Sequence, residues 1–143
     1  MKALTLKQPW AYHVALGEKR IENRSWAPPE SIHGELLAIH AGKGWDRECS
    51  VSGPTREALT FGSVIALVRV SCIVRSLEEA ERLGQGGWFV GPIGWVLEDV
   101  RPVAPVPAKG RQGLWNLPPE VEAQVLSNLE SIAKARALDP SGD

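Results

Sequence analysis

The chain has 143 residues, a formal net charge of −1 and a sequence pI of about 6.3. Its length suits one domain with a core of its own, so we expect a single domain over residues 1–143. The near-neutral balance excludes a globally basic nucleic-acid-binding protein, although it leaves room for a local basic patch. Cys49 and Cys72 are too few for a disulfide framework, and no Cys/His cluster predicts zinc, so we expect neither a metal nor a cofactor.

Signals for secretion or membrane insertion are not visible in the sequence. The N-terminus carries no charged leader followed by an apolar run, and no stretch approaches the length of about 20 apolar residues that spans a bilayer. We therefore expect a cytoplasmic monomer that does not bind a membrane.

The N-terminal third predicts a strand, a short helix and an extended segment. Residues 2–7 alternate as a strand does. Pro9 suits the first turn of a helix, and Gly17 can end that helix in a left-handed conformation. The charged segment 17–26 that follows should be extended, and 34–41 reads as a second strand.

The middle of the chain alternates loops with one strongly apolar strand. Gly42-Lys43-Gly44 predicts a flexible turn, and 45–59 predicts a helix in two pieces. Residues 63–74 are β-branched and almost continuously apolar, which indicates a central strand covered on both faces. Ser76 with Glu79 predicts a helix N-terminus, so a short helix should run to about residue 83, before a glycine-rich loop.

The C-terminal third predicts two strands and a helix. Residues 93–103 read as a strand that continues into a proline-rich extended connection, and 112–116 as a last short strand. An apolar stripe with helical spacing predicts a helix over about 119–137, and 139–143 should be a frayed tail. Several strands with helices at their edges favour an α+β fold built on a small β-barrel or a strongly curved sheet.

The segment 17–26 is the most informative stretch because neither face of the expected strand is apolar. One face carries Arg20, Glu22, Arg24 and Trp26, and the other carries Lys19, Ile21, Asn23 and Ser25. Opposite charges two residues apart indicate a polar cleft in which a carboxylate orients guanidinium groups and an indole offers a flat surface. Such a cleft suits an anionic, aromatic ligand such as a nucleotide.

Individual side chains in this cleft each have a structural alternative. If the cleft excludes water, Lys19 can act as an acid–base group, and if the cleft is wet, Lys19 can contact a phosphate. The structural alternative is a solvated surface lysine with no role in a site. Glu22 is a ligand-reading acceptor or an ion-pair partner rather than a base, because neighbouring arginines lower a carboxyl pKa. Trp26 either stacks on a base of the ligand or packs in the hydrophobic core. Arg24 is suited to bidentate contacts with phosphate.

Three cations elsewhere lie on turns that could approach phosphate groups. Lys43 is flanked by glycines, and Lys109 and Arg111 flank Gly110. Each is equally compatible with a solubility charge at a loop tip. A lone histidine in an apolar strand, His40, is more often a hydrogen-bonded core residue than a catalyst. Three other tryptophans are assigned to the core: Trp10, Trp95 and Trp115.

Five blocks of the sequence together resemble the ASCH domain (activating-signal-cointegrator homology domain), a branch of the PUA-like superfamily. They occur in family order at 4–10 (LTLKQPW), 17–26 (GEKRIENRSW), 39–43 (IHAGK), 94–97 (GWVL) and 109–115 (KGRQGLW). The Gly-x-Lys-x-x-Glu-x-Arg core alone is modestly specific, whereas five ordered blocks over about residues 3–117 make a chance match improbable.

The resemblance implies a PUA-like β-barrel with flanking helices and a role in recognising RNA or a nucleotide. Some similar members are single-domain bacterial ribonucleases. Another branch hydrolyses the amide of N4-acetylcytidine, with a threonine nucleophile at the position of Glu22 and a lysine at that of Lys19. Because this chain has Glu22 there, attack by a threonine is not available at that position.

The sequence thus supports three hypotheses about function. The first is an RNA- or nucleotide-binding protein, the second a ribonuclease or modified-nucleoside amidohydrolase in the same cleft, and the third a protein-interaction adaptor. The candidate catalytic residues are Lys19 and Glu22, and the candidate ligand-binding residues are Arg24, Trp26, Lys43, Lys109 and Arg111.

Overall fold

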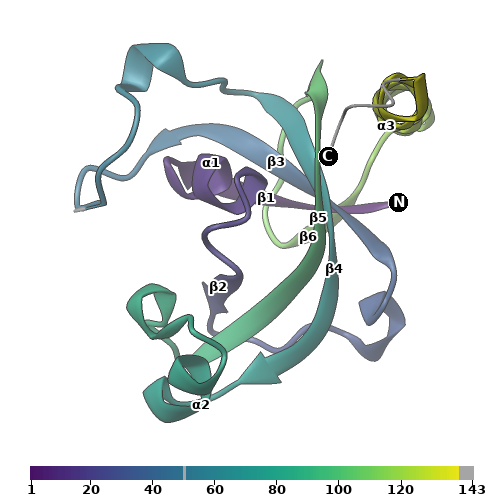
Figure 1. The fold of residues 1–143 in the computed structure, drawn as a ribbon. Coiled ribbons are helices and arrows are strands. Elements are labelled where there is room, and N and C mark those ends of the chain that lie inside the picture. Colours follow the sequence, from purple (N-terminus) through teal and green to yellow (C-terminus); the bar gives the residue numbers. More distant parts are fainter. Residues whose placement is uncertain (50, 139–143) are drawn as a thin grey trace.

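The computed structural model describes residues 1–49 and 51–138, which form a mixed α+β fold around a six-stranded sheet (Figure 1). The strands are β1 (Lys2–Gln8), β2 (Ile21–Arg24), β3 (Leu36–Trp45), β4 (Ser63–Val74), β5 (Ile93–Pro107) and β6 (Leu114–Asn116). The helices are α1 (Trp10–Ala15), α2 (Leu77–Arg82) and α3 (Pro119–Leu138).

The strand order in the sheet is β2-β5-β4-β3-β1-β6. Strand β1 pairs parallel to β3, whereas the pairs β3–β4, β4–β5, β5–β2 and β1–β6 are antiparallel. The short strand β6 covers only Lys2 to Leu4 of β1. The same edge of β1 over residues 5–8 pairs with no strand in the described part of the chain, and it faces β2 across a gap.

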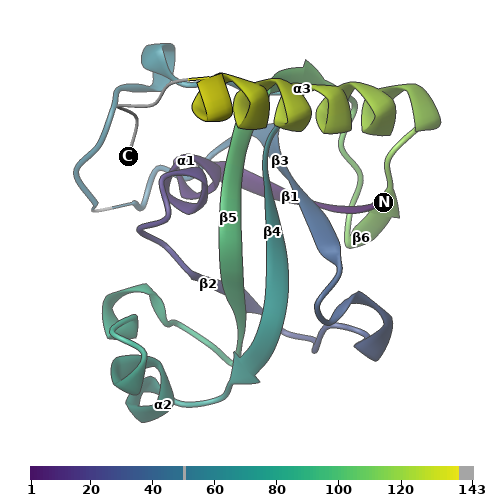
Figure 2. The ribbon, with the colours of Figure 1, turned by 45° about the vertical axis from the view of Figure 1, so that its right-hand side comes forward.

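Both faces of the sheet are buried, each by its own helix. Along β3, Leu37 and Ile39 face the core that includes residues of α1, while Ala38 faces the core closed by Val125 of α3. The alternation follows from the two-residue period of a strand. Figure 2 shows α3 lying across one end of the long strands β4 and β5, and Figure 1 shows α1 and β2 on the other side of these strands from α3.

Several predicted elements are confirmed by the structure. The apolar run 63–74 is β4, which lies inside the sheet between β3 and β5, although its last residues are partly exposed. Ser76 caps α2, since its Oγ accepts a hydrogen bond from the Glu79 amide at 3.2 Å. Val125, in the predicted apolar stripe of the C-terminal helix, is fully buried. The tail 139–143 lies outside the described residues.

Two local predictions were wrong. Within 45–59 the described residues form no α-helix, and the only regular piece is a 3-10 turn at 56–58. The turn expected at Gly42-Lys43-Gly44 is instead part of β3, which continues to Trp45 because Gln8 of β1 pairs with that residue. A Cβ atom on Gly42 would lie 2.8 Å from Thr5 Cγ2, so the glycine there lets β1 and β3 approach closely.

The α+β class is confirmed, whereas closure of the sheet into a barrel is not. The sheet is strongly curved (Figure 1), but β2 and β6 are its two ends in the strand order. Where β2 faces the free part of β1, a side chain spans the gap: Arg24 Nη2 donates to the Thr5 carbonyl oxygen at 3.1 Å. This unpaired seam of the sheet is where the candidate site lies.

Candidate functional site

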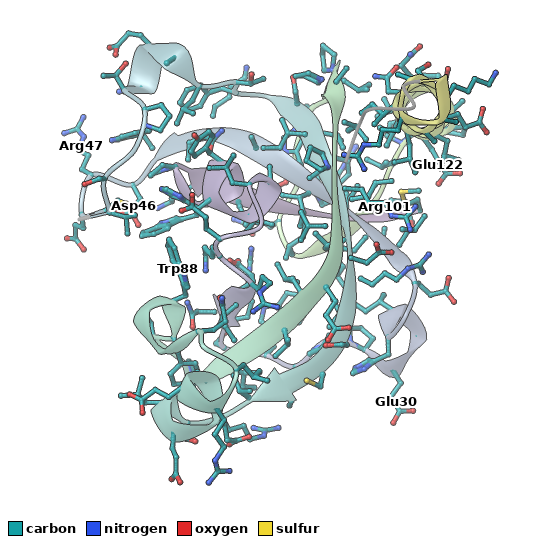
Figure 3. All side chains as sticks on the ribbon, viewed as in Figure 1. Glu30, Asp46, Arg47, Trp88, Arg101 and Glu122 are labelled. Atoms are coloured by element: carbon teal, nitrogen blue, oxygen red, sulfur yellow. The ribbon has the colours of Figure 1, made fainter. Side chains whose placement is uncertain are left out.

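A cleft of about 700 Å³ occupies the seam between β1 and β2. Its floor comes from these two strands, and its sides come from α1, the loop that follows β3 and the segment that follows α2. In Figure 3 Asp46 and Trp88 lie on this side of the molecule, whereas Arg101 and Glu122 lie on the opposite side.

Lys19 lies at the buried end of the chain segment that enters β2. Gly17, with φ +83°, ends α1 and turns the chain, and the Lys19 amide then donates to the His13 carbonyl at 3.2 Å. The Lys19 side chain is only 4% exposed, and its Nζ donates to the Ile21 carbonyl oxygen. Because Lys19 precedes the strand, it is not on the Ile21 face that simple alternation predicted, and it lines the cleft instead.

Glu22 and Arg24 form a partly buried ion pair on the cleft side of β2. Arg24 Nε donates to Glu22 Oε2 at 2.9 Å, and Lys19 Nζ lies 3.9 Å from Glu22 Oε1. The Glu22 side chain is 11% exposed. Its Oε1 receives no hydrogen bond from another described residue, so it keeps the capacity to accept one from a ligand.

Burial lowers the pKa of the Lys19 ammonium below its ordinary value. The Glu22 carboxylate opposes this shift and the Arg24 charge adds to it. Removing a lysine from water disfavours its charged form, which is how proteins obtain a neutral amine near physiological pH.

Two indoles, Trp10 and Trp88, flank the Lys19 ammonium. Nζ lies 5.8 Å from the ring centroid of Trp10 and 5.9 Å from that of Trp88, within the range of cation–π attraction. The two rings are nearly perpendicular, with centroids 6.4 Å apart. Both tryptophans line the cleft and are half-buried, so the assignment of Trp10 to the core was wrong.

Hydrogen bonds hold the indole of Trp10 and the backbone segment of Trp88. Trp10 Nε1 donates to Asp46 Oδ2 at 2.8 Å, and this bond, with one from the Glu48 amide, lowers the pKa of the Asp46 carboxyl. Asn23 of β2 fixes the Trp88 segment: its Nδ2 donates to the Trp88 carbonyl at 3.0 Å, and its Oδ1 accepts from the Val90 amide at 2.9 Å. The backbone that carries Trp88 is thus held by the strand that carries Glu22 and Arg24.

Trp26 is not brought together with these residues. Its ring packs edge-on against that of Trp95, with centroids 4.8 Å apart, and its carbonyl accepts a hydrogen bond from Trp95 Nε1 at 2.9 Å. It packs against the main core and lines neither the cleft nor the pocket described next. Trp95 and Trp115 are buried in the core, as predicted.

Lys43, Lys109 and Arg111 lie together in a second pocket of about 840 Å³ beside the cleft. Thr5 lines both hollows. Lys43 reaches this pocket from the end of β3, and the other two cations come from the loop between β5 and β6.

His40 forms the base of this second pocket and is 1% exposed. Its Nε2 lies 2.7 Å from the Ala108 carbonyl, so that nitrogen carries the proton, while its Nδ1 accepts from Thr5 Oγ1 at 3.2 Å. Thr5 Oγ1 in turn accepts from Trp115 Nε1 at 3.0 Å. Burial lowers the pKa of His40, with the Ala108 hydrogen bond opposing, which matches the predicted role of a hydrogen-bonded core residue.

The ASCH domain family model matches residues 4–134. The chain belongs to the ASCH domain family. This confirms the family identified from the five sequence blocks, and the match extends into α3.

Solved structures of ASCH domains have the same fold. The crystal structure of ASCH from Zymomonas mobilis is 18% identical, with a TM-score of 0.59, and the alignment covers 88% of this chain and 93% of that one. A serine-to-alanine mutant of the Z. mobilis protein gives a TM-score of 0.57 at 19% identity, covering 88% and 94% of the two chains. No curated protein matches significantly.

The two hollows of this ASCH domain differ in charge. The cleft is mixed: its acidic lining residues are Glu22, Asp46 and Glu48, and its basic ones are Lys7, Lys19 and Arg24. The second pocket has three cationic lining residues and no carboxylate among the described residues. Among the described residues, the cations that are not accompanied by carboxylates therefore line the second pocket rather than the cleft.

Sequence reasoning missed the indole of Trp88 and the carboxylate of Asp46. Trp88 follows a Gly-Gly pair, and a large aromatic residue in an otherwise small and polar loop is a signal that could have pointed to it. Outside the gap at residue 50 and the C-terminal end, no cluster of three or more His, Cys, Asp or Glu residues could hold a metal ion. Over the same residues, no helix is long and apolar enough to cross a membrane.

Proposed function

We propose that this ASCH domain binds RNA or a nucleotide, with one base held in the cleft between β1 and β2. The supporting observation is that Lys19, Glu22 and Arg24 line one cleft together with the indoles of Trp10 and Trp88, which flank the Lys19 ammonium. ASCH domains are generally RNA-binding, and the cleft volume of about 700 Å³ is within the range of small-molecule sites.

The chemistry of the cleft suits the edge and the face of a nucleobase. Glu22 Oε1 can accept a hydrogen bond from an exocyclic amine or ring N–H, and the Lys19 ammonium can donate to a ring carbonyl. Since Trp10 and Trp88 are perpendicular, a base that stacks on one indole meets the edge of the other. An amine donor beside a carbonyl acceptor on the same base would satisfy both groups.

The test compares binding of single-stranded RNA and mononucleotides by calorimetry in the wild type and in variants of the cleft. We expect Trp88→Leu to weaken binding by about 1–3 kcal/mol, the usual contribution of one stacked base. Trp26→Leu is the matched control, because that indole lies outside the cleft. Thermal unfolding verifies that both variants are folded. Equal losses in the two variants, or no binding of any nucleotide to the wild type, would exclude this function.

A second candidate, hydrolysis in the same cleft, is favoured by the lowered pKa of Lys19. A neutral Lys19 amine could accept the proton of a ribose 2′-hydroxyl as its oxygen attacks the adjacent phosphorus, while the bond to the 5′-oxygen breaks and that oxygen takes a proton from water. Arg24 could donate to the developing phosphorane charge.

Incubation with RNA and with N4-acetylcytidine distinguishes binding from turnover. Under the hydrolase hypothesis, Lys19→Ala abolishes product formation, whereas Lys134→Ala, an exposed change on α3, leaves the rate unchanged. Cleavage that persists in Lys19→Ala would eliminate Lys19 as the acid–base group. A role as a protein-interaction adaptor stays a prediction, and no contact described above favours it over the cleft.

A further inference from the structure

We propose that the pocket formed by Lys43, Lys109 and Arg111 is a separate phosphate subsite, so that the ligand is a phosphorylated nucleotide or an oligonucleotide rather than a free nucleoside. This inference rests on the proposed function of the neighbouring cleft. It assigns the base to one hollow and a phosphate to the other.

The charge of the pocket is not compensated within the described part of the protein. None of the three cations takes part in an ion pair with another described residue. Lys109 and Arg111 also border a hollow under the start of α3 whose described lining includes one acidic residue, Glu120, yet Glu120 pairs with neither. Three converging cations without a carboxylate among them repel one another, and a bound dianion would relieve that repulsion.

Hydrogen bonds at Ala108 fix the start of the loop that carries Lys109 and Arg111. The Ala108 carbonyl accepts from His40 Nε2, and the Ala108 amide donates to the Gly62 carbonyl at 3.0 Å. A Cβ atom on Gly110 would lie 2.7 Å from His40 Cε1 and 2.9 Å from Thr5 Oγ1, so only a glycine allows this contact.

Backbone donors of the same loop are available to a ligand. The amides of residues 109–112 donate no hydrogen bond to another described residue. Successive free amides next to cations are a known way of binding phosphate oxygens. Lys43 lines the same pocket from the end of β3. Its side chain lies next to Gly62, where a Cβ atom would be 3.8 Å from Lys43 Cε.

The cleft itself is a poorer place for a free phosphate dianion. Its lining includes Asp46 and Glu48 as well as Glu22, and the Arg24 guanidinium is already paired with Glu22 at 2.9 Å. Carboxylates accept hydrogen bonds from a base but repel a phosphate. Because Thr5 lines both hollows, a nucleotide can place its base in the cleft and a phosphate in the cationic pocket.

The first measurement follows amide shifts in two-dimensional NMR during titration. The probes are a nucleoside, its 5′- and 3′-monophosphates, a dinucleotide and inorganic phosphate. The nucleoside should shift only resonances of the cleft, namely the amides of Glu22 to Arg24 and the indole N–H of Trp88. One monophosphate and the dinucleotide should also shift the amide resonances of residues 109–112. These two ligands should bind at least about tenfold more tightly than the nucleoside. Inorganic phosphate should shift 109–112 alone.

The second measurement compares two triple variants that each remove three positive charges. One carries Lys43→Ala, Lys109→Ala and Arg111→Ala, and the other carries Lys2→Ala, Arg75→Ala and Lys134→Ala at exposed sites that line neither hollow. Only the first should reduce dinucleotide affinity to that of the nucleoside. It should also make the dependence of log K on log salt shallower, by about 0.7 for each phosphate that the protein no longer neutralises.

The outcomes separate this inference from the function on which it rests. If the dinucleotide shifts only the cleft, and both triple variants bind it equally, the phosphate subsite is refuted while the base cleft stands. If every phosphate-containing probe shifts only the amide resonances of residues 109–112, the pocket is an anion site and the cleft binds no base. That result would refute the proposed function, and with it the inference that the ligand is a nucleotide. Equal affinity for the nucleoside and its phosphates would also overturn the subsite.

Discussion

Lys19, Glu22 and Arg24 could be identified from the sequence because they are neighbours in the chain. The three charges lie within six residues of one another, which singles out the segment, and Arg24 and Glu22 meet at 2.9 Å because they share one face of β2, whereas the place of Lys19 depends on the turn at Gly17. Trp88 could not be found in the same way, since it reaches the cleft through its contact with Asn23, more than sixty positions earlier. Which of six tryptophans faces a cleft depends on tertiary packing, and the sequence pointed to Trp26 instead.

The burial of Lys19 predicts how folding stability depends on pH. In the unfolded chain Lys19 titrates near 10.5, and in the folded chain its pKa is lower. Between these two values the unfolded state binds more protons, so the stability contribution of Lys19 rises with pH over that window and is constant below the folded pKa. Lys19→Met removes this contribution. We therefore expect the wild type to gain stability relative to Lys19→Met as pH rises toward 10.5.

Urea unfolding of both proteins, from about pH 6 to about pH 10, measures this difference directly. Lys134→Met on exposed α3 provides the baseline for removing a lysine charge. A difference between wild type and Lys19→Met that does not change with pH would show that Lys19 is not desolvated in the folded protein.

At the scale of elements, boundaries were predictable where local chemistry sets them. The Ser76 cap fixes the start of α2, and the β-branched run gives both ends of β4. The end of β3 was not predictable, because Gly42 and Gly44 look like a turn until β1 pairs alongside them. The segment 45–59 was read as helical from its composition, but Asp46 instead bonds to the Trp10 indole and the Glu48 amide.

The seam between β1 and β2 predicts a stability cost for losing Arg24. Its guanidinium joins the two strands, donating to the Thr5 carbonyl at 3.1 Å and to Glu22 at 2.9 Å. Arg24→Ala leaves a buried carboxylate and a carbonyl without these donors, so we expect unfolding to become easier by about 1–3 kcal/mol. Arg20→Ala removes an exposed arginine from the same segment and should cost no more than about 0.5 kcal/mol. Chemical denaturation of both variants tests this, and equal costs would mean that Arg24 does not hold the seam.

For the molecule as a whole, the cleft and α3 belong to different cores. The cleft lies beside the core that contains α1, whereas α3 closes the core on the other face of the sheet (Figures 1 and 2). Within the described residues, none from α3 lines the cleft. The long C-terminal helix therefore stabilises the sheet without lining the cleft, and stability and ligand binding should be separable by mutation.

Val125→Asp tests that separation. Val125 is fully buried against the sheet, so a carboxylate there would be an unpaired buried charge and should cost at least about 3 kcal/mol. Ala123→Asp places the same residue on the exposed face of α3, two positions earlier, and should change stability by no more than about 0.5 kcal/mol. Thermal unfolding by circular dichroism measures both. At a temperature where both variants remain folded, nucleotide shifts at Glu22 to Arg24 should match those of the wild type. A cleft that loses its ligand in folded Val125→Asp, or equal destabilisation by the two substitutions, would show that α3 is coupled to the site or is not docked as described.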